Sequence, residues 1–140
     1  MSLFSSFDVS ASALTAQRFR MDLISGNIAN VNTTQTEAGG PFRRQLAVFE
    51  SVEMPPAPDG TPAPAMGVLA KMVEDTQTPF RKVHDPSHPQ ADADGYVTYP
   101  NVNIIEEMVN LLEALRSYQA NLTVIENDKE IFMRSLNITA

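Results

Sequence analysis

A cluster of histidine and aspartate residues after the middle of the chain is the first candidate for chemistry. Its members are His84, Asp85, His88, Asp92 and Asp94. Two histidines four residues apart can bind zinc on a helix, but prolines at positions 86 and 89 disfavour a helix here. The segment from Asp92 resembles a calcium loop only faintly, because the final glutamate is missing and the glycine comes too early. We therefore predict a polar, turn-rich loop, with no metal site and no cofactor.

Catalytic motifs are also missing from the sequence. The chain lacks the Gly-x-Ser-x-Gly, phosphate-loop and His-Glu-x-x-His patterns. It has no cysteine, which excludes thiol catalysis, disulfides and cysteine-rich zinc sites. Glu106 and Glu107 are neighbours in a predicted helix, so they point in different directions and cannot flank one substrate. We predict that the protein is not an enzyme.

The strongest pattern in the chain is an apolar stripe in its last third. The stripe recurs at alternating spacings of four and three residues, which is the heptad pattern of a coiled-coil helix. A helix of this length extends for about 50 Å, which exceeds the core of a compact domain of this size. The stripe therefore needs a partner along its length. Its apolar members are Ile104, Met108, Leu111, Leu115, Tyr118, Leu122, Ile125, Phe132 and Leu136.

A weaker stripe near the N-terminus predicts a second amphipathic helix, over residues 1–31. It is interrupted by polar residues, and asparagine and threonine residues crowd together where the helix should end. Pairing between the two helices would cover about half of the C-terminal stripe, and we expect other subunits to cover the rest. We call both stripes together the assembly seam. Its N-terminal members are Phe7, Leu14, Met21 and Ile28.

The region between the two helices has a different composition. All ten prolines lie within residues 32–103, so this region cannot be one long helix. Strand-like patterns occur at 42–54, 66–73, 78–83 and 96–99, and a proline-rich loop occupies 55–65. We predict a mainly α fold, in which antiparallel coiled-coil helices at 1–31 and 104–140 flank a small irregular β-rich insertion at 32–103.

Charge and hydropathy exclude several classes of partner. The chain has 17 acidic and 10 basic residues, a net charge of −7, which argues against binding to nucleic acid. It has no run of about 18 apolar residues, so we expect no direct insertion into a membrane. Its first residues lack a basic start and a continuous apolar block, so we expect no cleaved signal peptide.

Both ends of the chain resemble flagellar basal-body rod proteins. Residues 29–33 read Ala-Asn-Val-Asn-Thr, which is similar to the signature of rod, hook and hook-associated proteins. Residues 94–103 and the helix that follows are similar to the C-terminal signature of the same group, most closely to the C-type protein of the proximal rod. The signature residues are Asn27, Ala29, Asn30, Thr33, Asp94, Gly95, Tyr96, Tyr99, Pro100 and Asn101.

This resemblance implies a function in assembly. It implies that the terminal helices pair and stack with those of other subunits into the hollow drive shaft that transmits torque. The implied partners are copies of the chain, other rod proteins, the MS ring, adaptor proteins at the rod base and the flagellar type III export apparatus. The implied location is the periplasmic rod of the basal body.

Some alternatives stay open at the level of sequence. The same long helix would suit a coiled-coil adaptor or a secretion chaperone that holds a client. Lys129, the charged position on the seam, can lay its stem on the seam and extend its amine to solvent, or pair with a carboxylate of another subunit. The Asn-rich signature can end a helix, bond to a neighbouring subunit, or do both. Either Asn101 or Asn103 can cap the C-terminal helix.

Overall fold

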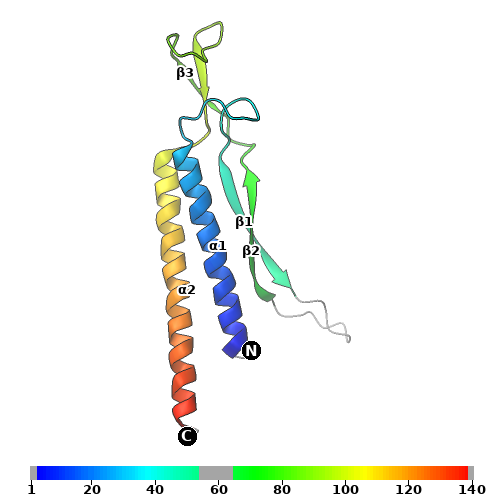
Figure 1. Ribbon diagram of the computed structural model, residues 1–140, viewed down its shortest axis with the longest axis vertical. Coiled ribbons are helices and arrows are strands. Elements are labelled where there is room, and N and C mark those ends of the chain that lie inside the picture. Colours follow the sequence, from blue (N-terminus) through cyan, green and yellow to red (C-terminus); the bar gives the residue numbers. More distant parts are fainter. Residues whose placement is uncertain (1–2, 54–64, 139–140) are drawn as a thin grey trace.

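The protein is an elongated molecule built from two long helices and four strands. A computed structural model describes residues 3–53 and 65–138. Helix α1 (Leu3–Ala29) and helix α2 (Ile104–Ile138) lie side by side and run antiparallel (Figure 1). Strands β1 (Gln45–Glu53) and β2 (Ala65–Glu74) form a ribbon along α1. Strands β3 (Arg81–His84) and β4 (Tyr96–Tyr99) form a second small sheet beyond the end of the helix pair.

The predicted mainly α fold with a coiled coil is wrong. About 49 % of the described residues are helical and 21 % lie in strands, which form two antiparallel sheets. The middle region is not a small irregular insertion, because β1 pairs with β2 over nine residues, from Gln45↔Glu74 to Glu53↔Ala65. Helix α1 contacts α2 and also both strands of this ribbon. The helix therefore divides its surface between a helix and a sheet, instead of forming one half of a two-helix coiled coil.

Side chains of α1 bond to the backbone at the unpaired edges of the ribbon. The amide of Val68 donates a 3.0 Å hydrogen bond to the hydroxyl of Ser12. Near the other end of the ribbon, the side chain of Asn27 bonds to both the amide and the carbonyl of Gln45. Gly67 is required for this close approach, because a Cβ atom at that position would lie 2.6 Å from Ser12 Oγ.

The second sheet forms the tip of the molecule. Its strands pair from Arg81↔Tyr99 to His84↔Tyr96, and Val97 is its buried residue. The 96–99 strand lies where the sequence predicted it, after a turn in which Gly95 has a φ of 80°. The predicted proline-rich loop at 55–65 lies almost entirely outside the described residues. No helix among the described residues is both long and apolar enough to cross a membrane.

Candidate assembly interface

Most of the C-terminal seam lies on the surface of α2. Six of its members are exposed, at fractions between 36 and 54 %. The other three, Leu111, Tyr118 and Ile125, are half-buried. Helix α2 contacts α1 and no other described helix or strand, so these three lie on the side nearest α1. The exposed members are Ile104, Met108, Leu115, Leu122, Phe132 and Leu136.

The buried face of α2 is offset from the seam. Glu107 and Ala114 are 1 and 0 % exposed, and the positions seven and fourteen residues further on, Asn121 and Asp128, are half-buried. These residues are polar or small, and Asp128 accepts a 2.6 Å hydrogen bond from the hydroxyl of Ser6. The intramolecular contact of α2 therefore combines this small, polar stripe with the half-buried seam residues Leu111, Tyr118 and Ile125. Much of the apolar stripe lies beside it, toward solvent.

The N-terminal members of the seam are partly covered by the rest of the protein. Phe7, Leu14, Met21 and Ile28 are all half-buried. The buried positions of α1 are different residues, and two of them are polar: Ser10, Ala16, Ile24 and Asn27. At Arg20, a guanidinium nitrogen lies 3.6 Å from a carboxylate oxygen of Glu113 on α2. The contact between the helices thus combines a few apolar side chains with hydrogen bonds and charge pairs.

A buried polar junction joins the end of α1, the start of β1 and the first turn of α2. Asn27 is 1 % exposed, and its amide nitrogen donates to the Gln45 carbonyl at 2.8 Å and to Glu107 Oε2 at 2.9 Å. Its amide oxygen accepts the Gln45 N–H at 2.9 Å. The side chain of Asn27 thereby bonds to both backbone groups of Gln45 and to Glu107 on α2, because it carries both a donor and an acceptor.

Arg44 supplies the positive charge of this junction. Its guanidinium lies 2.5 Å from Glu107 Oε1, and a second nitrogen is 3.9 Å from Asp75 Oδ2. Asp75 in turn accepts hydrogen bonds from the hydroxyl of Thr78 and from the amides of Thr78 and Gln77. The hydroxyl and amide of Thr78, the amide of Gln77 and the charge of Arg44 hold the pKa of Asp75 below its usual value. Both buried carboxylates are therefore compensated.

Asn101 connects the tip sheet to the junction. Its amide oxygen accepts the backbone N–H of Arg44 at 2.8 Å, and its amide nitrogen donates to the carbonyls of Asp75 and Thr78. Asn103 makes the helix cap instead, because its side-chain oxygen accepts the N–H of Ile105. The structure thus resolves which of the two asparagines caps α2.

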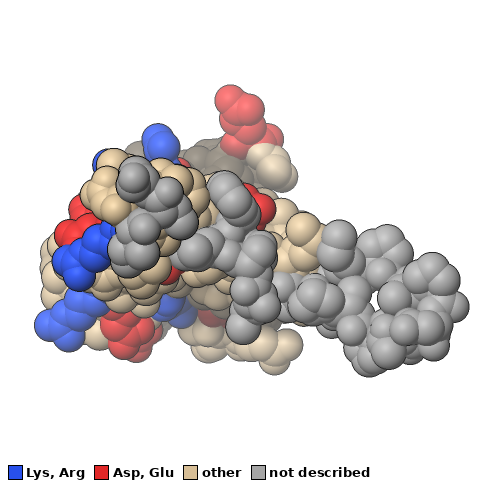
Figure 2. All heavy atoms as spheres, turned by 90° about the horizontal axis from the view of Figure 1, so that it is seen from below, with Lys and Arg blue, Asp and Glu red and all other residues tan. Residues whose placement is uncertain are grey.

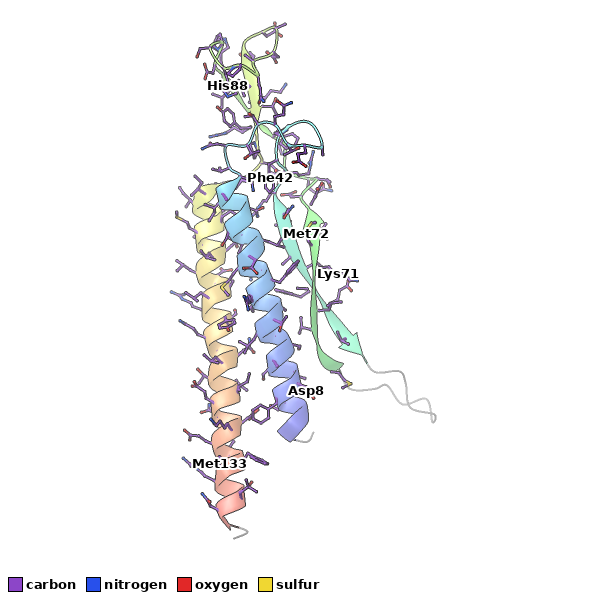
Figure 3. All side chains as sticks on the ribbon, in the orientation of Figure 1. Asp8, Phe42, Lys71, Met72, His88 and Met133 are labelled. Atoms are coloured by element: carbon purple, nitrogen blue, oxygen red, sulfur yellow. The ribbon has the colours of Figure 1, made fainter. Side chains whose placement is uncertain are left out.

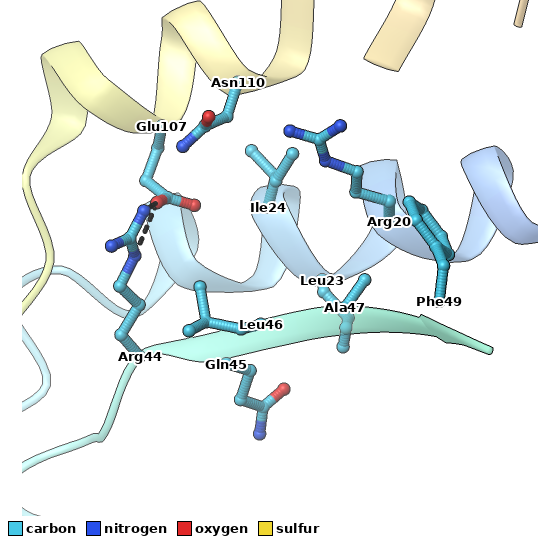
Figure 4. A pocket seen from close by; sticks show the side chains of 10 residues that line it. All are labelled: Arg20, Leu23, Ile24, Arg44, Gln45, Leu46, Ala47, Phe49, Glu107 and Asn110. Atoms are coloured by element: carbon cyan, nitrogen blue, oxygen red, sulfur yellow. Dashed lines mark hydrogen bonds and ion pairs between the residues drawn. The ribbon is translucent and has the colours of Figure 1, made fainter. Parts of the chain in front are cut away.

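A hollow of about 390 Å³ lies beside the junction, between α1, the start of α2 and β1 (Figure 4). The ion pair of Arg44 and Glu107 forms one end of this hollow. Apolar side chains line much of the remainder, among them Leu23, Ile24 and Leu46. Of the charged residues at its wall, Arg44 and Glu107 pair with each other, and Arg20 pairs with Glu113 on α2.

The histidine and aspartate cluster belongs to the tip, where Figure 3 labels His88. His84 stacks edge-on against Tyr96 with ring centroids 5.0 Å apart, and His88 lies near Tyr99. Asp85 accepts hydrogen bonds from the hydroxyl and amide of Ser87, which lower its pKa. The described residues contain no group of three or more His, Asp or Glu side chains that could hold a metal ion.

Further contacts of the Asn-rich signature lie within the chain. The amide nitrogen of Asn30 donates to the Gly26 carbonyl, and its amide oxygen accepts the hydroxyl of Thr33. Together with the bonds of Asn27 and Asn101, these contacts define the turn after α1 and the approach to α2. The seam extends along both helices, whereas the signature residues lie at the end of α1, in the tip and before the start of α2; the two sets meet at Ile28, between Asn27 and Ala29.

Comparison with known proteins decides the family. Residues 7–35 match the family described as "Flagella basal body rod protein", and residues 93–138 match "Flagellar basal body rod FlgEFG protein C-terminal". The chain is 43 % identical to the flagellar basal-body rod protein FlgC of Borreliella burgdorferi, over 99 % of this chain and 98 % of that protein. The chain belongs to the FlgC family of flagellar basal-body rod proteins.

Other FlgC proteins give the same result. The chain is 38 % identical to FlgC of Bacillus subtilis over 99 % of both chains, and 38 % identical to FlgC of Escherichia coli O6:H1. FlgC-family proteins are structural subunits of the flagellar basal body, which agrees with the prediction that this chain is not an enzyme.

The polar junction was not predicted from the sequence. Arg44 and Glu107 are 63 positions apart, and no local pattern pairs them. Glu107 was predicted only to lie beside Glu106 in a helix and to point in a different direction from it. The sequence offered one hint, which was the polar side chain of Asn27 near the end of a predicted helix. This hint does not show that Asn27 would bond to Gln45 and Glu107. Tertiary contacts alone bring the three residues together.

Proposed function

We propose that this chain polymerises through its terminal helices into the hollow rod and that the rod transmits torque. The observation that carries the proposal is the exposed apolar seam of α2. Leu115 and Leu122 are each 41 % exposed, although they belong to a regular heptad stripe. Burying such side chains against a neighbour stabilises the assembly by roughly 25 cal/mol for each Å² of apolar surface. Folding of the single chain leaves this apolar surface exposed to water.

The distribution of charge supports apolar contacts between subunits. Seen from the end where α2 finishes, charged side chains of both signs are interspersed among uncharged ones over the helices (Figure 2). The net charge of −7 makes identical subunits repel each other at long range. Attraction between copies therefore requires short-range burial, which the seam offers. We further propose that the partners include other rod proteins, the MS ring and adaptor proteins at the rod base.

The proposed route to this position is export. We propose that the flagellar type III apparatus carries the chain to the periplasm. The support is the similarity of the chain to basal-body rod proteins over nearly its full length. Cell fractionation tests this proposal, and a normal amount of the protein in the periplasm of cells that lack the export apparatus would contradict it.

The test of the seam introduces a charge into α2. We expect Leu122→Glu to abolish swimming, because an interface would bury the carboxylate without a partner at a cost of several kcal/mol. The measurement is a motility-agar assay in cells that lack their own copy of the gene. Immunoblots of whole cells and of purified basal bodies separate loss of incorporation from loss of synthesis.

Thr123→Glu is the matched control. It places the same charge one residue further along the same helix, at an exposed polar position. We expect nearly normal swimming from this variant. Normal swimming by Leu122→Glu, or equal loss by both variants, would mean that the seam does not carry assembly.

A further inference from the structure

The loop at the tip of the molecule is fastened to the turn after α1. This loop spans residues 85–95 and joins β3 to β4. In it, the side-chain oxygen of Gln90 accepts a hydrogen bond from the hydroxyl of Thr34, and its side-chain nitrogen donates one to the side-chain oxygen of Gln35. Both partners follow the Asn-rich signature in the sequence. We call the group of Gln90, Thr34 and Gln35 the tip latch.

His88 fixes the backbone of the residue that carries the latch. Its ring nitrogen Nδ1 accepts the N–H of Gln90 at 3.2 Å. The ring also lies beside Tyr99 on β4, with ring centroids 6.4 Å apart, and the N–H of His88 donates to the carbonyl of Asp85 at 3.2 Å. The half-buried imidazole therefore connects β4 to the loop that reaches the turn after α1 (Figure 3).

The bond at Nδ1 exists only in the uncharged form of the imidazole. A neutral imidazole has one nitrogen that accepts a hydrogen bond, whereas both nitrogens of an imidazolium donate. Histidine is also the side chain that ordinarily changes its charge between about pH 5 and 8. When His88 gains a proton, its Nδ1–H and the N–H of Gln90 point at each other, so the attraction becomes a repulsion. The loop therefore loses this bond as the pH falls and regains it as the pH rises.

The charged groups around His88 act on its charge but do not replace the lost acceptor. Asp85 belongs to the same turn and attracts an imidazolium whether the latch is closed or open, and its carboxylate already accepts two hydrogen bonds from Ser87. On β3, Arg81 packs against Tyr99 as well, with its Cζ 5.1 Å from the ring centroid, and its charge disfavours an imidazolium nearby. The turn after α1 contributes the two uncharged side chains of the latch.

The other charged groups of the tip are directed elsewhere. His84 packs edge-on against Tyr96, at a centroid distance of 5.0 Å. Asp92 uses one carboxylate oxygen to accept two backbone N–H groups at the end of the loop. Alternation along β3 places Lys82 on the opposite face from Arg81. His88 is thus the titratable side chain that bonds directly to the backbone of the latch.

We propose that His88 makes the tip latch sensitive to pH. A neutral imidazole holds Gln90 within reach of Thr34 and Gln35, and a protonated imidazole releases it. The firmness with which the tip is attached to the helix pair then depends on the acidity around the protein. This device goes beyond the proposed function, because it acts at the tip and does not involve the seam.

A pair of spin labels measures the state of the latch, because the chain has no cysteine of its own to compete for labelling. The double variant Ala38→Cys with Ala93→Cys carries one label beyond the latch turn and one on the loop, both at exposed positions. Double electron–electron resonance on the full chain gives the distribution of distances between the labels. We expect a narrow distribution at pH 7.5 and one at least twice as wide at pH 5.0.

His88→Asn in the labelled chain separates the acceptor from the charge. An asparagine side-chain oxygen can replace Nδ1 as the acceptor, but it does not titrate. This variant should keep the narrow distribution at both pH values, whereas His88→Ala, which lacks the acceptor, should be wide at both. His84→Asn is the matched control, since it changes the other histidine of the tip, and it should widen at pH 5.0 as the unmodified side chain does.

Two results would overturn the proposal. An equally narrow distribution at both pH values in the chain with His88 intact would show that the latch does not respond to pH. Widening at pH 5.0 that persists in His88→Asn, or that disappears in His84→Asn, would assign the response to another group.

A second measurement decides the case in which asparagine does not reproduce the acceptor and His88→Asn is wide at both pH values. The pH midpoint of the widening in the chain with both histidines should coincide with the midpoint of the His88 ring signals in NMR spectra of the same protein. A midpoint that follows the His84 ring, or neither ring, would refute the assignment. All of these outcomes leave the proposed function untouched, because Leu122→Glu tests the seam separately.

Discussion

At the residue scale, three polar residues connect the elements of the fold. They are Asn27, Arg44 and Glu107. They join three elements through hydrogen bonds of 2.8 to 2.9 Å. A buried carboxylate is costly unless it is paired and hydrogen-bonded, and here Glu107 has both kinds of partner. Such a junction favours the observed arrangement of α1, β1 and α2, because moving any one of the three elements would leave a buried polar group without its partner.

The junction leads to a prediction about stability. Glu107→Ala should lower the free energy of unfolding by about 3 kcal/mol, because it leaves Arg44 partly buried without its main partner. Urea denaturation of the purified protein, followed by circular dichroism, measures this loss. Glu130→Ala is the control, since its pair with Arg134 is exposed and should contribute no more than about 0.5 kcal/mol. Equal effects of the two substitutions would contradict a structural role for the junction.

At the scale of elements, the approach of α1 to the ribbon depends on Gly67. Gly67→Ala should destabilise the protein by about 1 to 3 kcal/mol, because the added Cβ would meet Ser12 Oγ at 2.6 Å. Gly26→Ala should act in the opposite direction. Apart from the neighbouring residues and the nearby backbone of α1 itself, no heavy atom lies within 4 Å of a Cβ there, and alanine favours the helix by up to about 1 kcal/mol.

Thermal unfolding of the two glycine variants gives the sign of each effect. The expected result is a lower midpoint for Gly67→Ala and an unchanged or higher midpoint for Gly26→Ala. A lower midpoint for both variants would mean that an added methyl group is unfavourable at either position, so the contact with Ser12 would not explain the loss at Gly67.

The elements differ in how far the sequence could predict them. Helices α1 and α2 and strand β4 were predictable, because heptad spacing and a turn before β-branched and aromatic residues are local signals. The packing of the ribbon on α1 was not, since it depends on Ser12 meeting Val68 and on Asn27 meeting Gln45. The heptad pattern also could not show which stripe of α2 faces α1. Glu107, Ala114, Asn121 and Asp128 occupy that stripe, although large apolar residues would be expected there.

At the scale of the whole molecule, apolar faces on an acidic body predict an unusual response to salt. Self-association of the purified subunit should strengthen as sodium chloride rises from about 10 to 150 mM, because salt screens repulsion between like charges and leaves apolar contacts intact. Sedimentation velocity over a range of protein concentrations measures the change. Leu122→Glu should associate less than the unmodified chain at every salt concentration. Weaker association of the unmodified chain at higher salt would indicate that ion pairs hold the copies together.

The contacts that α1 makes with the edges of the ribbon matter before any rod exists. An open strand edge can recruit nearly any other extended chain, because backbone groups are the same in all proteins. Ser12 and Asn27 occupy such groups at Val68 and Gln45. These bonds remove backbone groups with which another extended chain could otherwise pair. Helix α1 thereby protects the isolated chain against indiscriminate strand pairing at those two positions.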